Sequence, residues 1–417
     1  MLNELKPELL SISALNSFTQ HTSSSRATMF SSSHLGQSLV IEGCSKKRCR
    51  SGLEEEFGKY TFSIKVPCDA KVIKVIPKFK QVMGEKTLPD NPTTTIIYEN
   101  DQTKEVGMVK ILDNSVSIDQ KHQHFGFKYK KKSIIDKLQP GTFINKGTIL
   151  ADSPAIDDEG DYRYGIEANT AFMSVPGIIE DGLVVSDTFV KKLKTKGFEE
   201  RTVNWGDGQF PLNLYGNAQH YKPFPEIGQR VRPDGLLFAM RTYDDLLSPV
   251  EMSKRSLGEP DTIFDKLTYA EPNAKIVDVK VHHNTMAKNF STPTGMEYQA
   301  NKYFEAELSY HQSVIEVYDK LYHERRSGLS ISPEFHREVV FAMGFVGPEN
   351  IPALKRYPER IKREIYGTRV DKKYRRSDIN DWMVTVQFEY DVVPDLGFKI
   401  SNIFGGYEVF NLSLESE

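Results

Sequence analysis

The sequence predicts a mainly β fold with α+β insertions, and three observations carry that prediction. From residue 60 onward, short runs rich in β-branched and aromatic residues are bounded by Pro, Gly, Asp or Asn, as is typical of strands. They include TFSIKV at 61–66, AKVIKVI at 70–76 and TTTIIY at 93–98. Between 301 and 328 the apolar residues recur at steps of three and four, which predicts an amphipathic helix. The alternating run at 383–393 predicts a return to β structure, so a helical insertion inside a β domain is the simplest architecture.

Local signals predict the remaining elements. The Ser- and Thr-rich stretch at 10–45 is typical of a loop or linker. The runs GTFINKGTIL at 141–150 and GQRVRPDGLLF at 228–238 share a spacing of glycines, and we expect each to be a hairpin that returns a strand onto a small barrel. Gly328 is expected to cap the long helix, Pro333 to open a second helix, and residues 348–366 to form shorter ones.

Composition limits the class of protein. The chain has 417 residues, of which 39% are hydrophobic and 27% charged, so we expect it to fold around sizeable cores. The formal net charge of -3 excludes a purely electrostatic nucleic-acid binder. Cys44, Cys49 and Cys68 are too few and too unevenly spaced for a zinc site, so we expect no zinc. Without a signal-like start or an 18-residue apolar run, we expect a reducing compartment and no membrane.

Basic residues gather in three clusters. These are Lys46, Lys47, Arg48 and Arg50; Lys128, Lys130, Lys131 and Lys132; and Lys372, Lys373, Arg375 and Arg376. Such runs more often form a solvated face than a binding site, although three of them in a nearly neutral chain could line a groove that follows phosphates.

The most informative segment is YGIEANTAFMSVPGIIEDGLVVSDTFVKKL, at 164–193. It places the adjacent acids Glu180 and Asp181 at a bend between two apolar runs. Paired carboxylates at such a bend suit a hard divalent cation together with a triphosphate. On spacing alone, an ordinary hairpin turn is the more common interpretation.

The run AFMSVPGIIEDGLVVSD resembles AFMPW-x-GYNFEDA-x-VISE, which enters the catalytic barrel of the β subunit of multisubunit DNA-directed RNA polymerases. The matching residues are Ala171, Phe172, Met173, Gly177, Glu180, Asp181, Val185 and Ser186. The aromatic residues of GYNF are absent and the loop is one residue shorter.

Further blocks resemble the same family in the same order along the chain. They are SSRATMFSSSHLGQ at 24–37, GTFINKGTILADSPAID at 141–157, IGQRVRPDGLLFAM at 227–240, LSPVEMSKRSLGEPDTIFDKLTYAEPNAKIVDVKV at 247–281 and PDLGFKISNIFGGYEV at 394–409. The last block resembles PGDKMAGRHGNKGV, with Phe404 in place of the family's His and Tyr407 in place of its second Lys. The resemblance implies the C-terminal-half fragment of a split β subunit, as in giant bacteriophages.

The implied fold is the β-subunit double-psi β-barrel with hybrid-binding, wall and flap elements. We expect an N-terminal segment with a fork-like, hybrid-binding block at 1–60, and a hybrid-binding region with the first part of the barrel at 61–230. We expect a wall- and flap-like region with the helical insert at 231–382, and the return strand of the barrel at 383–417. Because the family's second lysine is missing, we also consider that the coding sequence is interrupted near Gly406 and that residues from Tyr407 are read-through.

The implied activity is nucleotidyl transfer in transcription, by a subunit that is inactive alone. The resemblance assigns catalytic roles to Glu180, Asp181 and Lys399, and nucleic-acid contacts to Arg26, Gln37, Lys46, Lys47, Arg48 and Arg50. Asp181 would reach the second Mg²⁺ directly or through water, whereas the main Mg²⁺ ligands would lie on a β′ partner.

The implied partners are other β fragments, β′-like chains, template DNA, nascent RNA and nucleoside triphosphates. The implied location is the cytoplasm of an infected bacterial host, or the virion. The main alternative is a structural or regulatory phage protein that keeps the β scaffold without catalysis. An independent β module that binds a carbohydrate or another small ligand is a third possibility.

Overall fold

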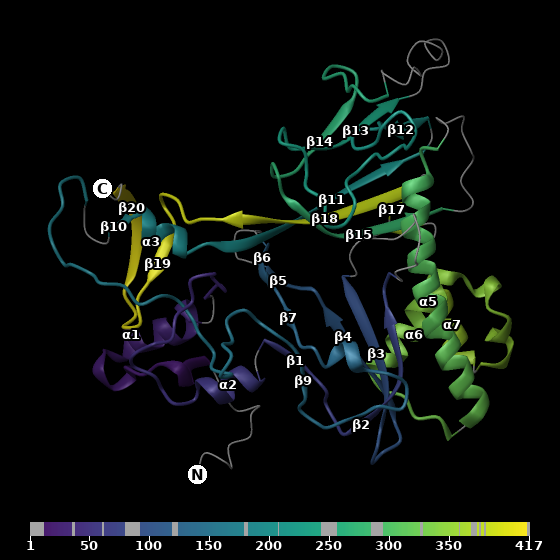
Figure 1. The fold of residues 1–417 in the computed structure, drawn as a ribbon, viewed down its shortest axis with the longest axis horizontal. Coiled ribbons are helices and arrows are strands. Elements are labelled where there is room, and N and C mark those ends of the chain that lie inside the picture. The colour runs from purple at the N-terminus through teal and green to yellow at the C-terminus, as the bar shows by residue number, and fades with distance from the viewer. Residues whose placement is uncertain are drawn as a thin grey trace.

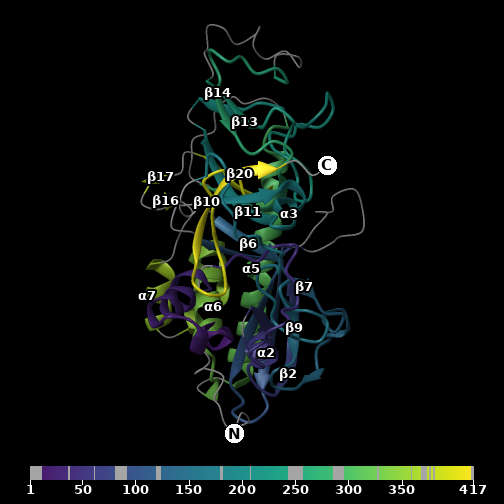
Figure 2. The same ribbon diagram turned by 90° about the vertical axis from the view of Figure 1, so that its left-hand side faces the viewer.

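A computed structural model describes residues 12–35, 38–60, 62–79, 92–118, 124–178, 182–206, 208–242, 257–284, 295–325, 328–357, 359–367, 373–374, 377–378 and 381–414. The fold is mainly β, with most of the long helices gathered on one side (Figures 1 and 2). In the described part of the chain, no helix is both long enough and apolar enough to cross a membrane.

The largest sheet has five antiparallel strands in the order β15-β18-β11-β6-β5. These are β15 (Lys275–His283), β18 (Trp382–Val392), β11 (Thr195–Trp205), β6 (His124–Lys128) and β5 (Asn114–Ile118). The strand predicted at 383–393 is confirmed as β18, whose Val384, Val386 and Phe388 are fully buried. Both faces of β18 are largely covered, because the β12-β13-β14 sheet packs on this region through a shared apolar core.

The helical insertion is confirmed. The chain leaves β15 and runs through α5 (Tyr298–Arg325), α6 (Pro333–Val346), η8 (Pro348–Asn350), η9 (Pro352–Arg356) and α7 (Glu359–Gly367) before it returns as β18. Its two ends meet, since His283 pairs with Trp382. The hydroxyl of Ser332 accepts a hydrogen bond from Phe335 N at 3.2 Å, which caps α6 as Pro333 predicts. Helix α5 ends at Arg325, however, so Gly328 is not its immediate cap.

The helices cover a second sheet of order β4-β3-β2-β8. Its strands are β2 (Ala70–Pro77), β3 (Thr93–Asn100), β4 (Val106–Leu112) and β8 (Phe143–Ile144), and the strand predictions at 70–76 and 93–98 are confirmed. Ile76, Ile97 and Val106 from this sheet share a core with residues of α5 and α6. A third small sheet joins β1 (Ser63–Lys65), β9 (Ile149–Asp152) and β7 (Lys130–Lys131), with η6 (Ile135–Lys137) nearby in sequence.

Both hairpin predictions are wrong. Within 141–150, strand β8 pairs with β2 whereas β9 pairs with β1 and β7, so the chain passes from one sheet to another. Within 228–238, the backbone N–H of Gly228 donates to the carbonyl of Ile276 in β15, and that of Val231 donates to the carbonyl of Ala274 just before β15. Strand β13 (Leu236–Thr242) pairs with β12 (Gln209–Pro211) and β14 (Lys266–Tyr269). The glycine turns permit these changes of direction, but the partners come from distant segments.

The N-terminal segment is folded, which corrects the prediction of a loop or linker at 10–45. It forms η3 (Ile12–Leu15), η4 (Thr19–His21), α1 (Ser24–Met29), the π-helical turn η5 (Phe30–His34) and then α2 (Glu54–Tyr60). Leu15, Phe30, Leu35 and Phe57 are buried together. A few apolar anchors outweigh the low helix propensity of the serines, and Ser23 caps α1 by accepting from Arg26 N.

A three-stranded sheet of order β10-β20-β19 lies at the opposite end from the helical insertion (Figure 1). It contains β10 (Gly182–Ser186), β19 (Lys399–Ser401) and β20 (Tyr407–Leu414), with α3 (Asp187–Lys192) following β10. Because β20 is the central strand and Phe410 is 3% exposed, the residues from Tyr407 belong to the fold. Whether the coding sequence is interrupted near Gly406 is a separate prediction, which peptide mass spectrometry of the C-terminal region tests. A two-residue pair, β16 (Lys373–Tyr374) with β17 (Ser377–Asp378), completes the described strands.

Candidate functional site

Three sequence blocks meet at the β10-β20-β19 sheet. Val409 of β20 pairs with Gly182 of β10 on one side and with Lys399 of β19 on the other. With neighbouring strands about 4.8 Å apart, the backbones at Gly182 and Lys399 are separated by about 10 Å. The Lys399 residue is exposed, and Figures 1 and 2 agree that β10 and β20 lie side by side.

The predicted catalytic acids Glu180 and Asp181 lie outside the described residues. The described chain resumes at Gly182, which follows Asp181 directly and starts β10. The donor set that they offer, two adjacent carboxylates, has the hard oxygen chemistry that Mg²⁺ prefers. Gln37, assigned to nucleic acid, also lies outside the described residues.

The N-terminal block contacts the turn between β19 and β20. Arg26 Nη1 donates to the carbonyl of Gly405 at 3.1 Å, and Thr22 Oγ1 donates to the carbonyl of Phe404 at 3.2 Å. The rings of Phe18 and Phe404 are 4.8 Å apart. The Arg26 guanidinium therefore helps to hold the turn that follows Lys399, a structural contact that the sequence analysis did not predict.

Gly405 occupies a position where a side chain does not fit. Its φ of +82° lies in the left-handed region, and a Cβ there would be 2.3 Å from the carbonyl oxygen of Arg26. Asn402 Oδ1 accepts from Phe404 N at 3.0 Å and from Gly406 N at 2.9 Å, which fixes the turn. Gly405, which lies in the block at 394–409, is thus required by the close approach of two distant chain segments.

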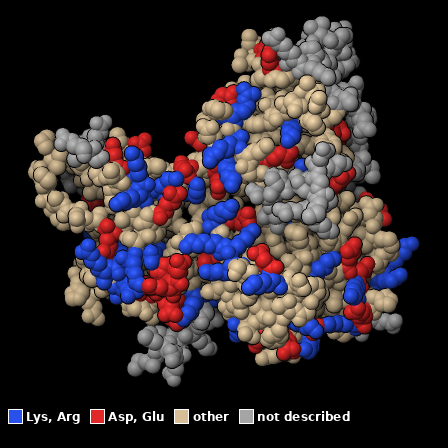
Figure 3. All heavy atoms as spheres, in the orientation of Figure 1, with Lys and Arg blue, Asp and Glu red and all other residues tan. Residues whose placement is uncertain are grey.

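The first basic cluster is neutralised by acids that lie more than 100 residues away in sequence. Lys46 forms ion pairs with Glu159 and Asp161, and Arg50 Nη1 lies 2.6 Å from Asp161 Oδ2. Arg48 Nε lies 3.3 Å from Glu167 Oε2. In Figure 3, acidic and basic side chains are intermixed on the face in view. A phosphate would therefore compete with carboxylates for these cations.

Lys47 has a different environment from its neighbours. Its Nζ lies 5.2 Å from the centre of the Tyr164 ring, in a cation–π contact. Burial lowers the pKa of the Lys47 ammonium, while the negative charge of Glu167 opposes this shift. Lys47 is half-buried and packs against the segment that begins at Tyr164.

The acidic run that complements the basic cluster at 46–50 was not predicted from the sequence. Carboxylate oxygens of Asp157, Glu159 and Asp161 lie within 4.8 Å of one another, which is a spacing that a cation could bridge. Asp157 Oδ2 forms an ion pair with Arg163 Nη2 at 2.7 Å. Glu159 pairs with Lys46, and Asp161 pairs with Arg50, both in the basic cluster. These carboxylates thus form an ion-pair network. The run AIDDEGDYR, next to residues of the family block, was the available signal.

The other basic clusters also have local partners where they are described. Lys131 pairs with Asp113, Lys132 pairs with Asp152, and Lys130 Nζ donates to the carbonyl of Ile156 at 3.2 Å. In the cluster at 372–376, only the backbone of Lys373 and Tyr374 is described. The three cysteines are free thiols, and burial raises the pKa of Cys44 and of Cys68.

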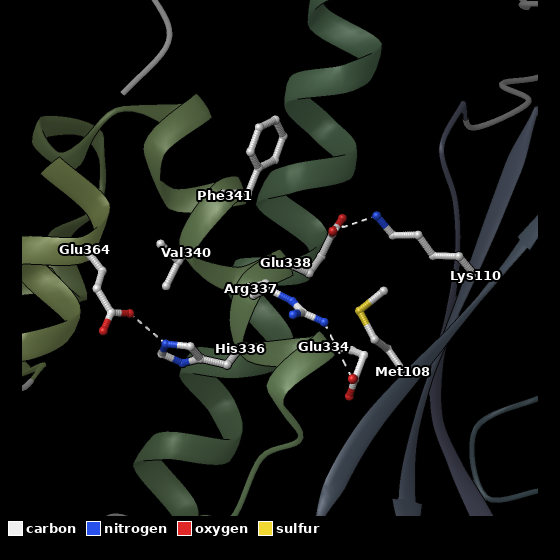
Figure 4. Close-up of a pocket in the computed structure, with 9 residues that line it drawn as sticks. All are labelled: Met108, Lys110, Glu334, His336, Arg337, Glu338, Val340, Phe341 and Glu364. Carbon is white, nitrogen blue, oxygen red and sulfur yellow. Dashed lines mark hydrogen bonds and ion pairs between the residues drawn. The ribbon is translucent and has the colours of Figure 1, made fainter. Parts of the chain in front are cut away.

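An open pocket of about 910 Å³ lies between β4, α6 and α7 (Figure 4). It is lined by Met108, Lys110, Glu334, His336, Arg337, Glu338, Val340, Phe341 and Glu364. Its charges are arranged in pairs: Lys110 Nζ is 2.6 Å from Glu338, His336 Nε2 is 2.7 Å from Glu364, and Arg337 is 3.5 Å from Glu334. The His336 hydrogen bond lowers the pKa of Glu364. Such mutual pairing is typical of helix–sheet and helix–helix docking, so the pocket is a weaker candidate than the sheet.

Comparison with models of known protein families gave no match, and comparison with curated proteins gave no significant relative. The functional assignment therefore depends on the residues themselves and on their placement.

Proposed function

We propose that this chain is a subunit of a viral multisubunit DNA-directed RNA polymerase, which contributes to the nucleotidyl-transfer site and to binding of the RNA–DNA hybrid. One observation carries the proposal. The three blocks that resemble the polymerase β subunit most directly, around Arg26, after Asp181 and around Lys399, converge on one small sheet although they span nearly the whole chain.

We propose further that β10, β19 and β20 belong to a double-psi barrel of the β-subunit type. The parallel pairing of β10 with β20 supports this, because it joins strands more than 200 residues apart. The pairing brings Lys399 to the same end of the sheet as the residue that follows the acidic pair. Residues 182–186 and 407–414 would then form part of the frame that orients the reacting groups.

Each proposed site residue has a chemical role. Mg²⁺, held mainly by a β′-like partner, would supply the charge that stabilises a pentavalent phosphoryl transition state. Asp181 would orient the second ion directly or through water, and Glu180 would add negative charge beside it. The ammonium of Lys399 would bind a phosphate of the nucleotide or of the transcript. Arg26 would act on this site by holding the turn after Lys399 through Gly405.

The proposed test is reconstitution with the β′-like chains and the other β fragment, followed by measurement of templated RNA synthesis. We expect the chain alone to be inactive, because a single acidic pair cannot hold two Mg²⁺ ions with near-octahedral geometry. Synthesis by the chain alone would contradict the proposal, as would an assembled complex that binds no template and extends no RNA.

Within an active complex, we expect Asp181→Ala to slow nucleotide addition by one to three orders of magnitude. The loss corresponds to about 3 kcal/mol of charge stabilisation in the transition state. Asp158→Ala provides the matched control, because Asp158 is an exposed acid elsewhere on the chain. Extension rates within twofold of the unmodified complex at saturating Mg²⁺ would show that the acidic turn is structural. That outcome would favour the alternative, a structural or regulatory phage protein that keeps the scaffold.

A further inference from the structure

The segment at 167–178 forms an arm that stands away from the body of the protein. It leaves the N-terminal region after Tyr164, whose hydroxyl donates to the carbonyl of Leu15 at 3.1 Å, and it leads toward β10. Figures 1 and 3 show the arm as a loop at the outer edge of the molecule, beside β10 and α3. No backbone hydrogen bond from 168–174 reaches another described residue.

The arm exposes the largest apolar side chains of its segment. Phe172 is 95% exposed and Met173 is 73% exposed, and all described residues from 167 to 174 are exposed. The segment from 168 to 179 contains no charged residue, although 27% of the chain is charged. A charge-free, apolar surface of this kind is typical of a protein interface, and it offers no cation to a nucleic-acid phosphate.

The arrangement of the apolar residues also indicates what kind of surface would cover them. Phe172 and Met173 are adjacent in sequence, and their neighbours from 168 to 174 are exposed as well, so a partner that buries both side chains must surround the arm. A groove in another protein can do this.

An independent observation comes from the sheet that the arm enters. Parallel strands are normally covered on both faces, yet Gly182, Leu183 and Val184 of β10 are only partly buried. Among the side chains that the structure describes, the buried core of this sheet consists of Val185, Val190 and Phe410. Strand β10 is also an edge of the sheet, with β20 on its one paired side in the described part of the chain. In the described part of the chain, the sheet therefore has an unpaired edge at β10, whose apolar residues Leu183 and Val184 are only partly buried.

We infer that the arm at 167–178 and the open edge of β10 are completed by a separate protein chain, which adds at least one β-strand beside β10 and encloses Phe172 and Met173. Main-chain hydrogen bonds along β10 would hold the added strand, and Phe172 and Met173 would fill apolar pockets of the same partner. The identity of the partner as another polymerase subunit rests on the proposed function. The need for a strand-contributing protein rests on the exposure of the arm and on the partly buried edge strand β10.

The first test is site-specific photo-crosslinking in the full-length chain, co-expressed with the β′-like chains and the other β fragment. p-Benzoylphenylalanine replaces Phe172 in one variant and Phe264 in a control, because Phe264 is 80% exposed but lies in the loop before β14. We expect position 172 to crosslink to an apolar strand of another chain, identified by mass spectrometry, and position 264 not to reach that peptide. Crosslinks only within the chain, only to a second copy of it, or to the same peptide from both positions would overturn the inference.

The second test compares F172S/M173S with I263S/F264S. Ile263 and Phe264 are 82% and 80% exposed, so both double variants remove exposed apolar surface. We expect only the arm variant to weaken binding of the partner, by roughly tenfold or more. The melting temperature of the chain alone should be unchanged in both, which separates lost binding from lost folding. Equal binding by both variants would refute the inference.

The two tests distinguish this inference from the proposed function. A partner strand found at Phe172 in a complex without RNA synthesis would support the inference and contradict the polymerase assignment. RNA synthesis by a complex in which Phe172 contacts no partner chain would support the assignment and overturn the inference.

Discussion

Replacement of Gly405 by alanine tests whether the contact between the N-terminal block and the turn after Lys399 holds the candidate site together. In the folded chain the new Cβ would lie 2.3 Å from the carbonyl oxygen and 2.8 Å from the carbonyl carbon of Arg26. Both atoms belong to the backbone of α1, so no side-chain rotation relieves the clash. The turn or the helix must move, and the Arg26 hydrogen bond to the Gly405 carbonyl must lengthen or break.

The expected cost has two parts. The left-handed backbone at Gly405, with φ of +82°, costs about 1–2 kcal/mol for alanine. Displacement of tightly packed backbone costs about 1–3 kcal/mol more. Gly397→Ala is the matched control, because Gly397 has a φ of +86° but a Cβ there meets nothing within 4 Å. Gly397→Ala should therefore lose only the roughly 1–2 kcal/mol that the left-handed backbone costs.

The assay is urea-induced unfolding of both variants, combined with hydrogen exchange of the peptides that contain α1. We expect Gly405→Ala to lower the free energy of unfolding by about 1–3 kcal/mol more than Gly397→Ala. We also expect it to accelerate exchange at 18–30. Equal stabilities within about 0.5 kcal/mol, with unchanged exchange in α1, would refute the reasoning, because the distance to Arg26 would then have no energetic consequence.

Other predictions concern charge. Lys46→Gln with Arg50→Gln should shorten the lifetime of the elongation complex and flatten its salt dependence, whereas neutralising 372–376 should have little effect. Asp161→Asn should lengthen that lifetime, because it releases Lys46 and Arg50 from an ion-pair partner. Weaker template binding by this variant would show that these ion pairs are purely structural. Burial lowers the pKa of His311 to about 3, and its ring nitrogens have no hydrogen-bond partner among described residues. The folded state thus resists protonation that the unfolded state accepts, so stability should fall as pH drops from about 6.5 toward 3. His311→Leu should reduce that slope and leave stability at pH 7 equal or higher in urea titrations; an unchanged slope would contradict the assignment.

The helical insertion illustrates what could be predicted locally. The step of three and four residues in α5, the Ser332-Pro333 start of α6 and the alternation in β18 each lie within one short window of sequence. Their physical causes are equally local, because helix periodicity, capping and strand alternation depend on neighbours along the chain.

The N-terminal segment illustrates where composition misleads. Serines are frequent in loops, yet Leu15, Phe30 and Leu35 find a shared core with Phe57 and with the aromatic residues that follow residue 155. The burial that fixes this segment comes from partners far along the chain. Propensity alone could not show that those partners were available.

In the candidate site, too, the residue types can be predicted from the sequence, whereas their spatial relations cannot. The β-rich order of elements, the helical insertion and the residue types at Glu180, Asp181 and Lys399 that suggest phosphoryl chemistry can be predicted from the sequence. Only the folded chain shows that Lys399 and Gly182 flank one strand, that Lys46 and Arg50 pair with acids, and that Tyr407 begins the central strand of the sheet. The reason is that pairing between distant segments depends on three-dimensional complementarity and on the entropy of loop closure, neither of which leaves a periodic pattern in the sequence.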